Sequence, residues 1–226
     1  GAIEYESALA AASPELSPEL VGSWSGDDLY LCYTGGTTGM PKGTMWRQAD
    51  FVVAALGVRH RDGRDYLTLD ELVADARGTV RALPAPPLMH GAAHWNALSS
   101  WLAGGTVVIQ SVVQRFDPGD VLDTVERHGA TSLLVVGDPM ARPLVDTLRA
   151  DSAAGRQRDL GSLRHLLSGG AVLSPHLKQD LLELLPGLMI VDVLGSTESG
   201  RQGVSHVRSG DDTRSSFTPS DTAAVL

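Results

Sequence analysis

The sequence predicts an α/β protein with a largely parallel sheet and helices on both faces of that sheet. Two observations carry this prediction: short β-branched or Leu-rich runs alternate with amphipathic stretches, and several of those stretches begin at Asp-Pro or Ser-Pro pairs. Repeated β-α units imply parallel strands joined by crossover helices. A chain of 226 residues with 42% hydrophobic residues is long enough to bury such a core.

The first 26 residues are expected to form a loose lead-in segment, because Pro and Gly interrupt every helical pattern there. A buried strand follows at residues 29–33, then a loop rich in Gly and Thr and an amphipathic stretch over residues 48–58. Thr68 and Glu71 have the spacing of a capping box, which predicts a helix from there to about residue 77.

Strands and helices alternate more regularly in the rest of the chain. The expected elements are a helix at 94–103, a strand at 106–110, a helix from Asp117-Pro118 to 128, a strand at 132–136, a helix from Asp138-Pro139, a strand at 163–167, a helix from Ser174-Pro175 to 185 and a strand at 188–194. Pro143 predicts a kink or a delayed start in its helix. A polar linker is expected at 150–159, and no periodic element is expected after Gly200.

Charge and cysteine content exclude several classes of function. The 27 acidic and 18 basic residues leave a net charge of -9, which disfavours nucleic acid as a partner. The single cysteine, Cys32, excludes an internal disulfide framework and a cysteine-based zinc cluster, and it fits a reducing, cytoplasmic compartment. No apolar run approaches the ~20 residues of a transmembrane helix, and the N-terminus lacks the basic start of a secretory signal.

The sharpest motif is the loop T-G-G-T-T-G-M-P-K-G at residues 34–43. Its glycines let backbone N–H groups approach an anion, its threonines add hydroxyl donors, and its lysine adds a positive charge, so the loop is a candidate polyphosphate cradle. The candidate residues are Thr34, Gly35, Gly36, Thr37, Thr38, Gly39 and Lys42. A Walker A loop is excluded because Pro41 precedes the lysine and Gly43 follows it. Pro41 also predicts that the loop does not lead straight into a helix.

This loop resembles the signature loop of the adenylate-forming (AMP-binding) superfamily, which includes acyl-CoA synthetases, luciferases and the adenylation domains of peptide synthetases. Most members have Ser where this chain has Gly35. The resemblance implies that the fold is part of the large N-terminal domain of such an enzyme. It also implies that Lys42 holds the leaving phosphates of ATP.

Three further motifs follow in the order that the resemblance requires: P-P-L-M-H-G at 86–91, L-L-S-G-G-A at 166–171 and D-V-L-G-S-T-E at 192–198. The resemblance implies that the first motif places His90 and Gly91 beside the acyl pocket and that the second places Gly170 and Ala171 along the adenine. By the same resemblance, the third would supply the remaining nucleotide-binding residues, namely Asp192 at the adenine amino group, Leu194 in place of a stacking aromatic, Gly195, Ser196, Thr197 at the α-phosphate and Glu198 as the Mg²⁺ ligand.

Two rival chemistries fit the residues less well. His90 and His94 have the spacing of two zinc ligands on one helix, but the glutamate of a metalloprotease is missing and no cysteine is nearby. Taken alone, His90 reads as a satisfied core or surface histidine. No G-x-S-x-G elbow occurs, so a serine hydrolase is a poor interpretation.

The resemblance implies that a carboxylic acid attacks the α-phosphate of ATP and that coenzyme A then captures the acyl-adenylate. Trp95 and Trp101 favour a fatty or otherwise hydrophobic acid, although such aromatics are more often core residues. The family's ribose-binding motif, hinge and catalytic-lysine domain are not found. The lysine count supports the absence of the catalytic-lysine domain, because the two lysines, Lys42 and Lys178, lie in the loop and in an expected helix. We therefore expect residues 27–226 to be a partial AMP-binding domain that is inactive by itself.

Three hypotheses remain open from the sequence. The chain is a piece of an acyl-CoA synthetase, a piece of a fatty acyl-AMP ligase that loads a carrier protein, or a short nucleotide-binding module without catalysis.

Overall fold

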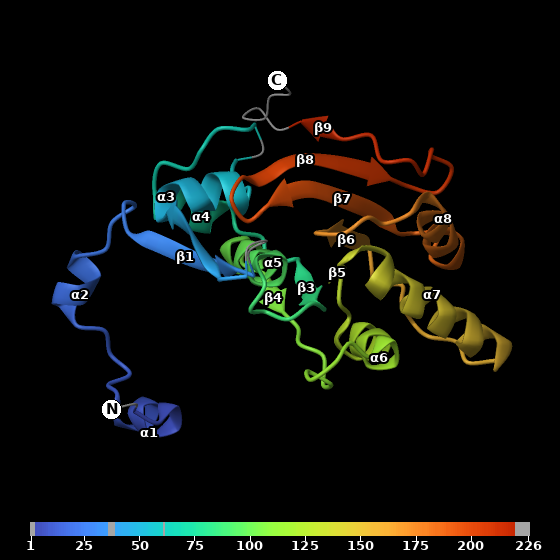
Figure 1. Cartoon of the computed structure of the whole chain (residues 1–226), viewed down its shortest axis with the longest axis horizontal. Coiled ribbons are helices and arrows are strands. Elements are labelled where there is room, and N and C mark those ends of the chain that lie inside the picture. The colour runs from blue at the N-terminus through green and yellow to red at the C-terminus, as the bar shows by residue number, and fades with distance from the viewer. Residues whose placement is uncertain (1–2, 36–38, 61, 220–226) are drawn as a thin grey trace.

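The computed structural model describes residues 3–35, 39–60 and 62–219. Its main sheet has seven strands in the order β4-β3-β5-β6-β7-β8-β9, and β3, β4, β5, β6 and β7 pair in parallel (Figure 1). The strands are β3 (Arg81–Pro84), β4 (Thr106–Val107), β5 (Ser132–Val135), β6 (His165–Gly169), β7 (Met189–Ser196), β8 (Gly200–Val207) and β9 (Thr218–Pro219). Only β8 and β9 run antiparallel to their neighbours. The predicted largely parallel sheet is confirmed.

The main hydrophobic core lies between one face of this sheet and three helices, α6 (Pro118–His128), α7 (Gly137–Ala153) and α8 (Pro175–Leu184). Alternate strand residues such as Leu133, Leu166 and Ile190 point into it because side chains alternate between the faces of a strand. Helix α6 has the predicted signals at both ends. The Asp117 carboxylate accepts a hydrogen bond from the Asp120 N–H at 3.1 Å, and Gly129 ends the helix with φ of 59°.

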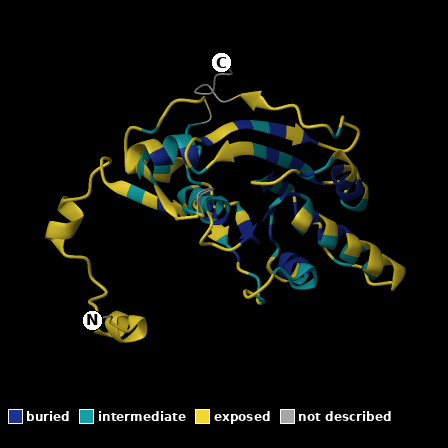
Figure 2. Ribbon diagram, in the orientation of Figure 1, coloured by how far each residue is buried: buried dark blue, intermediate teal, exposed yellow. Residues whose placement is uncertain are grey.

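The opposite face of the sheet is covered by α5 (Gly91–Leu102), which packs on β3, and by a short π-helix, η1 (Phe51–Ala55), which lies against β8. The expected helical stretch after residue 48 therefore consists of α3 (Gln48–Asp50) followed by η1. Helices thus occupy both faces of the sheet, as the sequence predicts. Figure 2 shows that burial is concentrated along the sheet and the helix faces turned toward it.

The expected strand at 29–33 is present as β1 (Leu29–Thr34), but it is not a buried strand of the parallel sheet. It pairs antiparallel with β2 (Lys42–Arg47) in a separate two-stranded sheet. Only one side of this hairpin is covered. Tyr30 stacks on Phe51 with ring centroids 4.1 Å apart, whereas Leu29, Leu31 and Tyr33 are exposed.

The lead-in segment is exposed along the part that the structure describes, yet it contains two short helices, α1 (Tyr5–Ala11) and α2 (Pro18–Gly22). The expectation that proline interrupts every helical pattern in this segment was wrong at Pro18, where α2 begins. Proline is compatible with the first helical position, where its missing N–H has no partner to lose, and the Ser17 hydroxyl caps the next turn at 3.1 Å.

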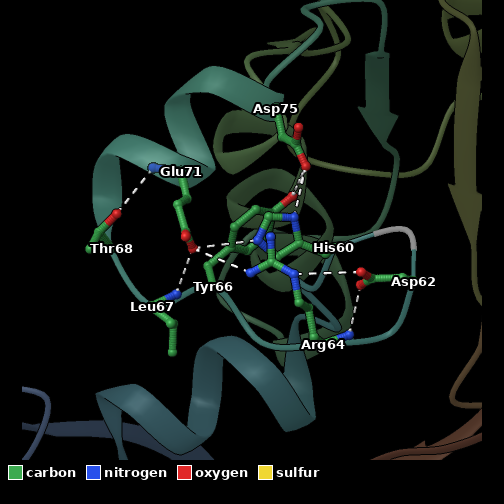
Figure 3. A network of polar contacts seen from close by, with 8 residues as sticks. All are labelled: His60, Asp62, Arg64, Tyr66, Leu67, Thr68, Glu71 and Asp75. Carbon is green, nitrogen blue, oxygen red and sulfur yellow. Dashed lines mark hydrogen bonds and ion pairs between the residues drawn. The ribbon is translucent and has the colours of Figure 1, made fainter.

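Helix α4 (Leu69–Asp75) and the segment before it form a polar network (Figure 3). Thr68 caps the helix, since its hydroxyl accepts from the Glu71 N–H at 3.2 Å, which confirms the predicted start. His60 lies between two carboxylates, with Nδ1 3.0 Å from Asp75 and Nε2 3.5 Å from Glu71. The Tyr66 hydroxyl donates to Asp75 at 3.1 Å. The network ties α4 to the segment that follows η1.

Two further expectations differ from the structure. Helix α7 begins at Gly137 and continues through Pro143 to Ala153, so the proline does not delay its start and part of the expected 150–159 linker is helical. Burial of Ala141, Leu144 and Val145 in the main core favours the continuous helix over the local preference of proline. The rest of the linker is anchored by Arg158, whose buried side chain pairs with Asp123 and Asp151.

The second difference is β8, which the sequence did not predict. Its alternate residues Gly203, Ser205 and Val207 are buried within the seven-stranded sheet. Two of these three residues are not apolar, so the period of two is hidden from a hydrophobicity pattern.

Candidate active site

A cavity of about 320 Å³ lies between α5, η1 and the face of the sheet opposite the main core. The described residues that line it come from the carboxyl ends of β5, β6 and β7, from the β7–β8 turn and from the two covering helices. They are Ala55, Leu56, Gly91, Ala92, Trp95, Asn96, Ser99, Leu134, Leu167, Gly169, Gly170, Val193, Gly195, Ser196, Thr197, Gly200 and Arg201. This is the edge of a parallel sheet at which α/β proteins bind ligands.

Glycines allow the β7–β8 turn to approach η1 closely. A Cβ built on Gly195 would lie 2.3 Å from the Gly200 carbonyl oxygen, and one on Gly200 would lie 2.8 Å from the Ala54 carbonyl oxygen. Gly200 also has φ of 68°, which side chains disfavour. The pairing of β7 with β8 shifts register between Leu194 and Gly195, and this irregularity turns the end of the motif toward the cavity.

The structure brings together residues from three of the predicted motifs. Gly91 comes from the first, Gly170 from the second, and Gly195, Ser196 and Thr197 from the third, and all of them line the cavity. Glu198 is exposed in the turn just beyond them, and no described residue forms a hydrogen bond or ion pair with its carboxylate.

The hairpin that carries the phosphate loop is attached to this site through aromatic side chains. The Trp46 indole N–H donates to the Thr197 carbonyl oxygen at 2.8 Å. The Trp95 indole N–H donates to the Tyr30 hydroxyl at 2.9 Å, and partial burial raises the pKa of Tyr30 to about 12. These contacts hold β1 and β2 against α5 and the β7–β8 turn.

The described part of the phosphate loop lies at the open end of the hairpin. Thr34 pairs with Lys42 across the two strands, and its hydroxyl donates to the Lys42 carbonyl oxygen at 3.4 Å. Gly35 and Gly39 are exposed, as is Lys42, whose ammonium forms no hydrogen bond or ion pair with a described residue. Gly36, Thr37 and Thr38 lie outside the described residues. The loop leads into β2, which confirms that it does not open a helix.

The geometry of the two histidines does not support a shared metal. His90 is the exposed N-cap residue of α5. The Nδ1 atom of His94 lies 3.0 Å from the His90 carbonyl oxygen and 3.1 Å from that of Leu88, and its Nε2 contacts the Tyr30 hydroxyl. Both ring nitrogens of His94 therefore contact protein oxygen atoms. Among the described residues there is no cluster of three or more His, Cys, Asp or Glu side chains that could hold a metal ion.

Asp192 is placed away from the cavity, contrary to its expected role at an adenine ring. Its buried carboxylate pairs with the ammonium of Lys178 on α8 and accepts from the Ser215 hydroxyl at 2.7 Å. Side chains alternate along β7, so Asp192 shares the α8 side with Ile190 while Val193 lines the cavity. Leu194, which is 48% exposed, and the exposed Ala171 do not line the cavity either.

Comparison with known proteins identifies the family. The AMP-binding enzyme family matches residues 3–220, which include the described part of the lead-in segment. The chain belongs to the AMP-binding enzyme family. This assignment confirms the resemblance that the four motifs carry.

Two relatives in the AMP-binding family illustrate the likeness. The chain is 43% identical over 206 residues to the medium-chain acyl-CoA ligase Mig of Mycobacterium avium, with 89% of this chain and 36% of the relative covered. It is 39% identical over 215 residues to a 3-oxocholest-4-en-26-oate–CoA ligase of Rhodococcus rhodochrous, with 93% and 38% covered. The chain thus spans less than two fifths of either relative.

Solved structures of AMP-binding enzymes share the fold. The N-terminal domain of FACL13 from Mycobacterium tuberculosis superposes with a TM-score of 0.64 at 22% identity, with 90% of this chain and 45% of that one covered. PA1221, a peptide synthetase protein with adenylation and carrier domains, gives 0.61 at 27% identity, with 84% and 34% covered. None of the helices in the described ranges is both long and apolar enough to cross a membrane.

Asn96 and Arg201 are among the cavity residues that the sequence analysis missed. Asn96 lies on α5 and Arg201 lies at the start of β8. The only available signal was their closeness to a recognised motif, because Asn96 follows His90 by six positions and Arg201 follows Glu198 by three.

Proposed function

We propose that the protein carrying this chain activates a hydrophobic carboxylic acid with ATP and transfers the acyl group to coenzyme A. The observation that carries the proposal is the single cavity in which residues of three motifs meet, beside the turn that holds Glu198. The names of the two acyl-CoA ligase relatives support the same reaction class. The chain spans only part of those relatives, so this activity is proposed for the whole protein and not for the 226 residues alone.

In the first step, a carboxylate oxygen of the acid attacks the α-phosphorus of ATP and the bond to the pyrophosphate oxygen breaks. Catalysis of such an in-line displacement depends on placement and charge stabilisation, without a protein nucleophile. Lys42, whose ammonium is exposed and unpaired among the described residues, would hold the departing phosphates. Thr197 would hydrogen-bond the α-phosphate from the cavity wall.

Glu198 fits the role of a magnesium ligand. Mg²⁺ prefers carboxylate oxygen and commonly binds through one or two carboxylates plus substrate phosphates. The Glu198 carboxylate is exposed and has no competing partner among the described residues, so it is available for such a site. When bound, the ion would neutralise charge on the phosphates.

The acyl group and the adenine would occupy different parts of the site. The apolar walls formed by Trp95, Leu134 and Leu167 suit a fatty or otherwise hydrophobic acid. Gly170, which has no side chain, leaves backbone free to lie along the adenine. Leu194 would contact the base by dispersion. We assign no adenine contact to Asp192, since its carboxylate is already paired with Lys178.

The acceptor of the acyl group distinguishes the two enzyme hypotheses. We favour coenzyme A, a cytoplasmic location and a place in lipid metabolism, supported by the ligase relatives and by the free, buried Cys32. Thioester formation with coenzyme A would support this acceptor, and transfer only to a carrier protein would favour the fatty acyl-AMP ligase instead.

The decisive experiment is acid-dependent exchange of labelled pyrophosphate into ATP, catalysed by the protein expressed from its complete reading frame. We expect exchange with medium- and long-chain acids and none without added acid. Nucleotide binding without exchange for any acid would favour the non-catalytic module. Exchange catalysed by the 226 residues alone would show that they contain the entire adenylation site.

A further inference from the structure

The cavity has largely apolar walls and one charged side chain. Among the described residues that line it, Arg201 is the only Lys, Arg, Asp or Glu. Most of the other walls are aliphatic or aromatic, such as Leu134, Leu167 and Trp95, or are glycine backbone. Arg201 is exposed, so water solvates its charge, and a ligand that displaces this water must replace those hydrogen bonds.

The position of the Arg201 guanidinium requires a glycine at position 57. Arg201 pairs with Gly195 across the β7–β8 turn. Its guanidinium reaches to Gly57, just after η1, where a Cβ would come within 2.3 Å of Nη2. The guanidinium therefore fills the space that a side chain at position 57 would occupy.

Two polar groups at the cavity lack partners within the described part of the protein. No hydrogen bond or ion pair joins the Arg201 guanidinium to another described residue. The Oδ1 atom of Asn96 is buried and also has no hydrogen-bond partner. Rotation of the Asn96 amide exchanges its oxygen and its NH₂ group, so this residue can donate or accept. Water can satisfy the exposed Arg201, whereas a buried unpaired atom such as Asn96 Oδ1 is rare in folded proteins and points to a ligand atom that completes it.

We propose that the cavity selects acids bearing a second oxygen acceptor, a keto or carboxylate oxygen remote from the reacting carboxyl group, and that Arg201 recognises this oxygen. This inference rests on the proposed function, because it names the class of acid that the same cavity takes. A guanidinium offers several N–H donors in a rigid plane that suits oxygen acceptors. A saturated chain would strip water from Arg201 without replacing its hydrogen bonds.

The test compares three acids of equal chain length: a saturated monocarboxylic acid, the same acid with a keto group near its far end, and the corresponding dicarboxylic acid. The kcat/KM for acid-dependent pyrophosphate release is measured with the protein expressed from its complete reading frame. We expect the wild type to prefer at least one oxygen-bearing acid over the saturated acid by about ten-fold or more. Arg201→Leu should bring that ratio to one or below.

Arg208→Leu is the matched control, because Arg208 is exposed just beyond β8 and does not line the cavity. It should keep the wild-type ratio. Arg201→Lys keeps the charge but loses the planar donors, and it provides a second variant if Arg201→Leu does not fold. It should keep part of the preference for the dicarboxylic acid and lose most of that for the keto acid.

The arms of the experiment separate the possible outcomes. Preference for the dicarboxylic acid alone identifies a carboxylate as the recognised group, and preference for both oxygen-bearing acids identifies any oxygen acceptor. An unchanged ratio in Arg201→Leu overturns the proposal. An equal loss with all three acids also overturns it, because Arg201 would then act on the reacting group that they share. A wild type that activates no acid contradicts the proposed function itself.

Discussion

The ammonium of Lys178 and the carboxylate of Asp192 form a buried ion pair between α8 and β7. Lys178 is fully buried, and its Nζ also donates to the Ser215 hydroxyl at 2.6 Å. Ser215 in turn donates to Asp192, so the chain segment after β8 is fastened to the same pair. This small network holds the strand that ends in Gly195, Ser196 and Thr197.

Removing one member of this pair should be more harmful than removing both. Lys178→Met leaves an unpaired carboxylate in the interior, and we expect it to lower the free energy of unfolding by about 3–5 kcal/mol. Lys178→Met combined with Asp192→Leu replaces the pair by apolar side chains and should recover much of that loss. Urea unfolding of the three proteins measures the difference. If the double variant is as unstable as Lys178→Met, the instability of the single variant does not come from the unpaired Asp192 carboxylate.

Glu198 and Lys42 should matter for adenylation and little for folding, because both are exposed and free of described partners. We expect Glu198→Ala or Lys42→Ala to reduce ATP–pyrophosphate exchange by about 10²–10³-fold. The free energy of unfolding should change by less than about 0.5 kcal/mol. The exposed Glu183 and Arg127 provide the matched controls, Glu183→Ala and Arg127→Ala. Wild-type exchange in either test variant would remove that residue from the site.

Gly195 should tolerate no side chain. In Gly195→Ala the new Cβ would lie 2.3 Å from the Gly200 carbonyl oxygen, so the β7–β8 turn must move. We expect a loss of about 1–3 kcal/mol in stability together with a loss of exchange activity. Gly187→Ala is the control, because its Cβ would meet its nearest neighbour, Arg164, at an ordinary 3.7 Å. Equal behaviour of the two variants would show that the close approach is unimportant.

The network of Figure 3 should loosen in acid. The Leu67 N–H lowers the pKa of Glu71, and the Tyr66 hydroxyl lowers that of Asp75. A carboxyl whose pKa is lowered by folding stabilises the fold above its ordinary range, about pH 4, and loses this contribution as the pH falls through the lowered value. We expect the protection of the α4 amides, measured as exchange relative to the intrinsic rate at each pH, to decrease below about pH 4.

Asp75→Asn should weaken that acid response, because it removes one of the two carboxyl groups whose pKa is lowered. Asp70→Asn changes the same kind of side chain in the same helix without touching the network, and it should behave as the wild type. Amide hydrogen exchange at several pH values distinguishes the variants. Protection factors in α4 that are the same at pH 3 and pH 6 would contradict the prediction.

Local signals in the chain were enough to predict the elements whose ends depend on nearby residues. The caps of α6 involve Asp117, Asp120 and Gly129, which contact positions no more than four residues away. The start of α4 at Thr68 depends on Glu71 in the same manner. The order of the motifs, from Lys42 to Glu198, likewise requires no knowledge of the fold and identified the family.

Only the tertiary structure decided which motif residues share a cavity and which do not. Asp192 and Val193 are adjacent in the sequence, yet the pleat of β7 directs one to Lys178 and the other to the cavity. The unbroken course of α7 past Pro143 and the reach of Arg201 to Gly57 likewise depend on contacts with segments far away along the chain. Such contacts depend on burial and close packing, which a one-dimensional pattern does not contain.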